Sequence, residues 1–172
     1  LTEPSLGFNF NVPNQNRHTE FLAIDFGICE EDGKIIPKLI EVQGFPSVFN
    51  FQYNLFEKIK KAYPYLSQFT PYLSDLDSDG YLKIFKETVL NGHQPEEVIL
   101  LEIEPEKQNT KIDFYYCQRD LGVPFVCVTK VIKKGKQLFY INKKGHEIQI
   151  KRIYNRVIFD ELEARKDLNM QF

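Results

Sequence analysis

The sequence predicts an α/β fold with an α+β lead portion, in which a β-hairpin and helices precede a small parallel α/β unit. Three observations support this fold class. An Asp-Gly pair at 32–33 separates two β-rich runs, and apolar residues recur at helical spacing over 49–60. From residue 96 onward, a short apolar run, a helical segment and a second apolar run follow one another. We therefore expect a division into 1–95 and 96–172.

Composition indicates an ordinary globular protein. The chain has 172 residues, of which 42% are hydrophobic and 27% charged, and its net charge is -2. This balance provides no overall basic field for nucleic acid, and no apolar run approaches the ~20 residues that a membrane-spanning helix needs. We expect a cytoplasmic protein without nucleic-acid or membrane partners, whose three cysteines (Cys29, Cys117 and Cys127) are reduced thiols.

The first half of the chain is expected to contain a hairpin and two helices. Residues 1–19 are rich in Asn and Pro and lack periodicity, which indicates an extended lead-in. Strands near 21–29 and 35–43 should pair antiparallel, because Asp-Gly between such runs favours a two-residue hairpin turn. Helical spacing then predicts helices over 49–63, before Pro64, and over 79–90.

The second half of the chain is expected to begin with a strand–helix–strand unit. The segment 96–104 contains a short continuous apolar run, which is typical of a strand covered on both faces. A helix over 110–122 and a strand over 124–132 follow, and this order implies two parallel strands. Two further strands are expected around 138–142 and 147–159, with a final helix beginning near 159.

An aspartate cluster at 75–80 resembles the opening of a calcium-binding EF-hand loop. The position that closes such a loop requires a bidentate glutamate, but here it is Lys86. Capping of the following helix by Asp77, Ser78 or Asp79 explains the cluster more simply.

Two acidic residues of the predicted hairpin form the leading candidate for a metal site. Asp25 lies within the first apolar run, and Glu41 and Gln43 lie two residues apart in the second. Because strand side chains alternate, Glu41 and Gln43 share one face, which a paired Asp25 can also reach. Two carboxylates and an amide oxygen suit Mg²⁺, which favours hard oxygen ligands. The alternative is that these acids simply face solvent, as is common on antiparallel hairpins.

Three further residues are candidates for substrate or phosphate binding. Glu104 follows the first predicted parallel strand, at the end where open α/β sheets place their ligands. Arg152 and Arg156 share a strand face and could bind phosphate or carboxylate bidentately. Helix-dipole compensation by Glu104 and ordinary ion pairing by the arginines are equally simple interpretations.

The hairpin sequence resembles a known family. The segments 23–26, 33–35 and 39–47 (Ala-Ile-Asp-Phe, Gly-Lys-Ile and Leu-Ile-Glu-Val-Gln-Gly-Phe-Pro-Ser) are similar to circularly permuted ATP-grasp ligases of the glutathionylspermidine synthetase type. In that family one strand carries Arg-x-Asp, and the next carries Glu-x-Asn followed by Ser or Thr. In this chain Ala23 stands in place of the arginine and Gln43 in place of the asparagine.

The resemblance implies specific roles for several residues. Asp25, Glu41 and Gln43 would hold Mg²⁺ beside the phosphates of ATP, and Ser47 would lie beside the substrate or phosphate. The segment after residue 96 is similar to the family's pre-ATP-grasp domain, which shapes the substrate cleft. The lysine-bearing strands that clamp ATP are absent from these 172 residues. Since the chain also begins with Leu1 rather than Met, we expect a fragment of a longer protein.

Two functions therefore follow from the sequence. The first is part of an ATP- and Mg²⁺-dependent carboxylate–amine ligase that is inactive as this fragment alone. Its partners would be a small-molecule amine, a carboxylate or peptide substrate, and the missing ATP-binding half. The alternative is a stand-alone ligand-binding or interaction domain with a degenerate site.

Overall fold

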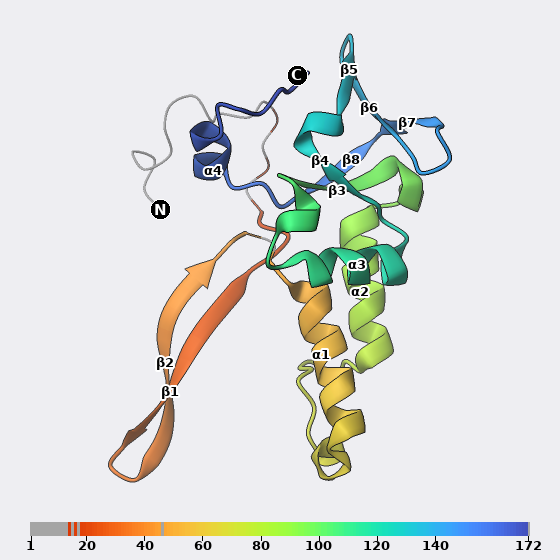
Figure 1. Ribbon diagram of the computed structural model, residues 1–172. Helices are drawn as coiled ribbons and strands as arrows, with labels where there is room; N and C mark the ends of the chain where they lie inside the picture. The colour runs from red at the N-terminus through yellow and green to blue at the C-terminus, as the bar shows by residue number, and fades with distance from the viewer. Residues whose placement is uncertain (1–13, 15, 17, 46, 172) are drawn as a thin grey trace. The chain divides into compact units, whose positions relative to one another are not determined.

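The computed structural model describes residues 14, 16, 18–45 and 47–171 and confirms the predicted α/β class (Figure 1). The chain divides into two compact units, Leu1–Gly44 and Phe45–Phe172. The second unit contains both the helices of the expected lead portion and the parallel sheet. The predicted lead-in over 1–19 lies mostly outside the described residues.

The first unit contains the predicted hairpin. Strands β1 (Ala23–Glu31) and β2 (Lys34–Gln43) pair antiparallel, as the sequence predicts. The turn residues Asp32 and Gly33 have φ angles of 50° and 73°. Positive φ at both central positions is the requirement of the two-residue hairpin turn that Asp-Gly favours, so local turn chemistry determines where the chain reverses.

A β-bulge gives the hairpin two chemically different faces. Asp25 lies opposite Glu41 but Phe26 lies opposite Leu39, so Ile40 is an extra residue in β2. A Cβ at Gly27 would lie 3.5 Å from Cδ1 of Ile40, which places Ile40 on the face of Asp25. The other face, here called the apolar face, carries the exposed residues Ile24, Phe26, Ile28, Ile35, Pro37, Leu39 and Val42, with Glu30 opposite Ile35 near the turn.

Two helices joined by a 3₁₀ turn begin the second unit. Helix α1 (Phe49–Ala62) precedes η3 (Pro64–Gln68), and α2 (Ser78–Leu90) packs against α1 through aromatic rings, including Tyr53 on Tyr81 at 5.9 Å. Asp77 caps α2, because its Oδ1 accepts a hydrogen bond of 2.7 Å from the Gly80 N–H. This contact confirms the capping interpretation of the aspartate cluster.

A three-stranded parallel sheet lies at the centre of the second unit. Its order is β4-β3-β8, formed by Phe125–Cys127, Val98–Glu102 and Arg152–Asn155. The predicted parallel pairing of β3 with β4 is confirmed, and helix α3 (Lys111–Leu121) connects them. The parallel pairing of β8 with the other edge of β3 was not predicted. Short 3₁₀ turns, η4 (Pro95–Glu97) and η5 (Pro105–Lys107), flank β3.

A small antiparallel meander completes the unit. Strands β5 (Ile132–Lys134), β6 (Gln137–Ile141) and β7 (Glu147–Ile150) follow the 3₁₀ turn η6 (Val128–Lys130), and α4 (Phe159–Ala164) comes after β8. The run predicted as one strand over 147–159 is thus two strands in different sheets, which is a correction to the sequence analysis.

The hydrophobic core surrounds β3, all of whose residues are buried. Ile99, Leu101 and Ile103 pack with residues of the meander and with Val157, whereas the alternate residues of β3 point to the opposite face of the sheet. Both faces of β3 are therefore covered, as its continuous apolar sequence predicts. Within the described part of the chain, none of the helices has the length and apolar character needed to cross a membrane.

Candidate functional site

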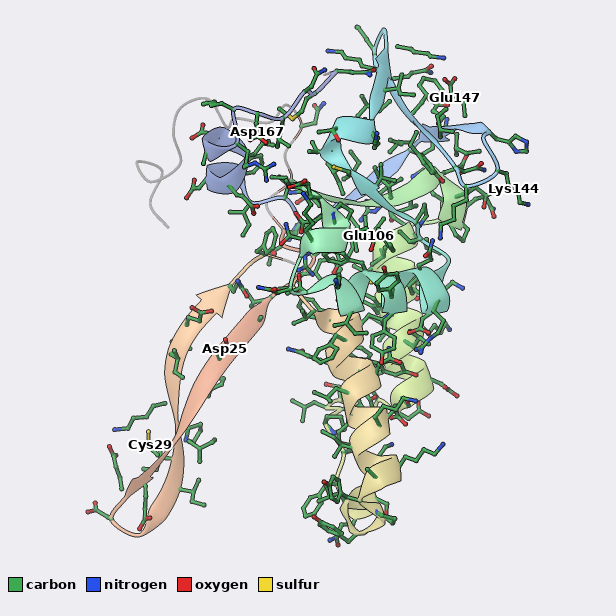
Figure 2. The ribbon with its side chains drawn as sticks, viewed as in Figure 1. Asp25, Cys29, Glu106, Lys144, Glu147 and Asp167 are labelled. Atoms are coloured by element: carbon green, nitrogen blue, oxygen red, sulfur yellow. The ribbon has the colours of Figure 1, made fainter. Side chains whose placement is uncertain are left out.

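The hairpin register brings the two predicted acidic ligands together. Asp25 of β1 lies directly opposite Glu41 of β2, and Ala23 lies opposite Gln43. Directly opposed residues have Cβ atoms about 4.5–5.5 Å apart, and alternate residues share a face. Asp25, Glu41 and Gln43 therefore lie on one face of the hairpin. Figure 2 shows the position of Asp25 along β1.

The two carboxylates of this face are exposed and share no counter-ion. Among the described residues, neither Asp25 nor Glu41 forms a hydrogen bond through its side chain or an ion pair. Two neighbouring negative charges favour the binding of a cation between them. Nowhere in the described ranges do three His, Cys, Asp or Glu side chains gather in a metal-binding group. A metal at this pair would therefore need Gln43, water or phosphate to complete its coordination.

The remaining predicted residues belong to the second unit. Ser47 is half-buried and lies two residues before the first residue of α1. Arg152 donates from Nε to the Val89 carbonyl at 3.0 Å and from Nη2 to the Thr88 carbonyl at 3.1 Å. These carbonyls belong to the last turn of α2, where a cation stabilises the helix dipole. Arg152 therefore anchors α2 to β8.

Glu104 is engaged in two ion pairs. Its Oε1 accepts from Lys107 Nζ at 2.5 Å, and its Oε2 accepts from Arg165 Nη1 at 3.1 Å. These two donors lower the pKa of the Glu104 carboxyl below its usual value. Glu104 thus links the turn after β3 to the segment after α4, and it remains ionised over a wider pH range.

Arg156, which follows the last residue of β8, forms a buried ion pair with Asp113. Its Nη1 lies 3.3 Å from Asp113 Oδ2, and both side chains are nearly inaccessible to solvent. The guanidinium also lies over the rings of Phe45 and Phe114, at 5.6 and 5.4 Å from their centroids. A buried Arg is stabilised by such a carboxylate and by cation–π contacts.

Asp113 also caps a helix that has no cap of its own. Val48, which precedes α1, provides no side-chain hydrogen bond, whereas Asp113 of α3 accepts from the Phe51 N–H at 2.8 Å. Burial raises the pKa of Asp113, while the Phe51 N–H and Arg156 act in the opposite direction. One carboxylate thus joins α1, α3 and the residue after β8.

Glu102 is a candidate that the sequence analysis did not single out. It is the last residue of the central strand β3, is 4% exposed, and accepts a hydrogen bond of 2.7 Å from the Ile103 N–H. Burial raises the pKa of its carboxyl to about 7. The signal in the sequence was its place at the carboxyl end of a buried parallel strand, where α/β sheets place functional groups.

The described residues therefore offer two chemically different groups. The hairpin face supplies paired, exposed carboxylates suited to a divalent cation, whereas the carboxyl end of the sheet supplies buried ionisable groups that hold each other in place. Comparison with protein-family models finds no match to this chain, and a search of curated protein sequences likewise finds none.

Proposed function

We propose that this chain is part of an ATP- and Mg²⁺-dependent carboxylate–amine ligase resembling glutathionylspermidine synthetase. The observation that carries the proposal is the cross-strand pair of Asp25 and Glu41, with Gln43 on the same face. These are the three positions that the resemblance assigns to the metal. Their common face results from the antiparallel register and is independent of the resemblance.

The chemistry of such a site is electrostatic. Mg²⁺ takes one or two carboxylates from a protein and completes its octahedron with water and phosphate oxygens. A cation held at this face would neutralise charge on ATP while the γ-phosphate passes to a carboxylate substrate, which gives an acyl phosphate and ADP. An amine would then attack the acyl carbon and displace inorganic phosphate. In this scheme Asp25 and Glu41 bind the cation and orient it, and Gln43 contributes its amide oxygen. Ser47 would contact the substrate or phosphate.

The proposal requires components beyond these residues. The lysines that clamp ATP would come from the missing ATP-binding half of the same protein, and the chain alone would not catalyse ligation. The substrates would be a small-molecule amine and a carboxylate or peptide. Arg152, Arg156 and Glu104 are already engaged with neighbouring residues of the second unit, so the proposal gives them no direct contact with substrate or phosphate. We further propose a cytoplasmic location, which suits three free thiols.

The experiment is substitution of the acidic pair in the longer protein, with ATP-dependent ligation measured by release of ADP. Glu41→Gln and Asp25→Asn should each reduce activity by about 100-fold or more, because each removes a charge from a metal ligand while preserving size. Glu20→Gln is the matched control, since Glu20 is an exposed carboxylate that precedes β1 and is not part of the apolar face. Ordinary activity in both pair variants would contradict the proposal.

The exposure of the pair favours a second candidate, a stand-alone ligand-binding or interaction domain. Both carboxylates are exposed, as the residues of a merely solvated face would be. This candidate predicts that Glu41→Gln, Asp25→Asn and Glu20→Gln all behave alike. The same set of variants therefore separates the two functions.

A further inference from the structure

A hollow of about 660 Å³ lies in the second unit, apart from the acidic hairpin. It is formed by residues of α1, the 3₁₀ turn η3, α2 and the end of α3. Its size is within the ~300–1,000 Å³ range of small-molecule sites. Its polar lining comes mainly from Glu57, Lys58, Lys60, Lys61, Arg119 and Asp120, with Tyr53 and Leu82 among the remaining residues.

The side chains that line the hollow carry more positive than negative charge. Four of the lining side chains are cationic and two are carboxylates. Glu57 is paired with Lys60 at 3.1 Å and accepts from Ser78 Oγ at 3.0 Å. Asp120 accepts from Asn54 at 2.9 Å and from Arg119 at 2.6 Å. Both carboxylates are therefore neutralised by their own neighbours and do not oppose an incoming anion.

Three cationic groups are left for a ligand. Within the described chain, Lys58, Lys61 and the Nη1 group of Arg119 have no hydrogen-bond or ion-pair partner. They come from two helices that are far apart in sequence but border the same hollow. Lys61 in the last turn of α1 also suits the helix dipole, but that role explains neither Lys58 nor Arg119.

Arg119 is held in a fixed orientation. Its Nε and Nη2 contact the Asp120 carboxylate at 2.6 and 2.9 Å, and Nη2 also donates to Asn54 Oδ1. Its guanidinium lies over the Tyr116 ring, 4.6 Å from the centroid. Asn54 is itself buried. A guanidinium fixed in this way binds an oxyanion with little further loss of side-chain entropy.

We infer that this hollow binds a small polyanion, whose charge is provided by phosphate or carboxylate groups. Lys58, Lys61 and Arg119 would contact the anionic groups, and Tyr53 and Leu82 would line the remainder of the molecule. A small molecule fits better than nucleic acid, because the cations border a hollow and the chain carries a net charge of -2. This site lies in the other unit and does not depend on the proposed ligase function.

The test is titration of the 172-residue chain with pyrophosphate and, separately, with citrate by isothermal calorimetry at low salt. We expect saturable binding of at least one probe, and the stronger probe distinguishes phosphate from carboxylate recognition. The double variant Lys58→Ala/Lys61→Ala should bind about tenfold or more weakly, since two charge-assisted contacts are lost. Circular dichroism establishes that the variant remains folded.

The matched control is Lys83→Ala/Lys86→Ala, which removes two exposed lysines of α2 that do not line the hollow. This control changes the net charge by the same amount but leaves the lining of the hollow intact. It should therefore retain nearly all of the affinity. Equal losses in both double variants would mean that only the overall charge matters, and would overturn the site. Unchanged binding by Lys58→Ala/Lys61→Ala, or failure of both probes to bind the unaltered chain, would overturn it as well.

Discussion

The buried carboxyl of Glu102 should make the stability of the second unit depend on pH. Its pKa is raised to about 7, from a usual value of 4.5, because burial at the end of β3 penalises the ionised form. Between these two values the folded state binds more protons than the unfolded state. The free energy of unfolding should therefore fall as the pH rises from about 4.5 to 7, and then level off.

The difference between the two pKa values sets the magnitude. A change from 4.5 to about 7 corresponds to about 3 kcal/mol, at 1.36 kcal/mol per pKa unit. Substitution Glu102→Gln removes the ionisation while preserving an oxygen that can accept from the Ile103 N–H. The variant should match the unaltered protein near pH 4.5 and exceed its stability by up to about 3 kcal/mol at pH 8.

The assay is urea unfolding followed by far-ultraviolet circular dichroism at several pH values between 4.5 and 8. The quantity of interest is the difference in free energy of unfolding between the Glu102→Gln variant and the unaltered protein. Subtraction removes the contributions of other titrating groups that the substitution leaves unchanged. Glu87→Gln, on the exposed surface of α2, is the control and should show no pH-dependent difference. A difference for Glu102→Gln that is constant across this range would refute the reasoning.

Two further predictions concern contacts within the second unit. Arg156→Met should cost about 3–5 kcal/mol because Asp113 would remain buried without its partner, whereas Arg156→Met combined with Asp113→Asn should cost less than the sum of the single changes. Urea unfolding of the two single variants and the double variant measures this coupling, and simple additivity would contradict it. Asp77→Ala should cost about 1 kcal/mol through loss of the α2 cap, and calcium should not raise the melting temperature of the unaltered protein.

Elements that depend on local sequence were predicted well. The hairpin followed from Asp32-Gly33, whose backbone angles suit the turn, and α1 ends before Pro64 as expected. The parallel pairing of β3 and β4 followed from the order strand–helix–strand, which leaves few alternatives. In each case the signal lay within a short stretch of the chain.

Elements that depend on distant partners could not be predicted in the same way. The run 147–159 reads as one strand, but it divides at Lys151, whose N–H donates to the Glu97 carbonyl at 2.8 Å. After that point the chain leaves the meander and joins β3. The choice between the two sheets is made by residues some 50 positions earlier, so no local pattern records it.

The candidate site residues also differ in whether their positions depend on local sequence or on distant partners. Asp25 and Glu41 share a face because a short hairpin determines their register, and this could be anticipated from alternation. The contacts of Arg152 with the end of α2 and of Arg156 with Asp113 join residues more than 40 positions apart. Two arginines on one strand therefore looked like a phosphate site, although each is engaged with a distant segment of the fold.

The apolar face of the hairpin bears on whether the acidic pair functions within a larger assembly. None of the described residues of 14–44 is buried. Even the large apolar side chains of Phe26, Ile28 and Ile35 are 51%, 74% and 77% exposed. An isolated two-stranded hairpin is only marginally stable in water, since it cannot bury a hydrophobic face. Something must cover this face for the opposite one to hold Asp25 and Glu41 rigidly enough to bind a metal. In the proposed ligase, the ATP-binding half would cover this face.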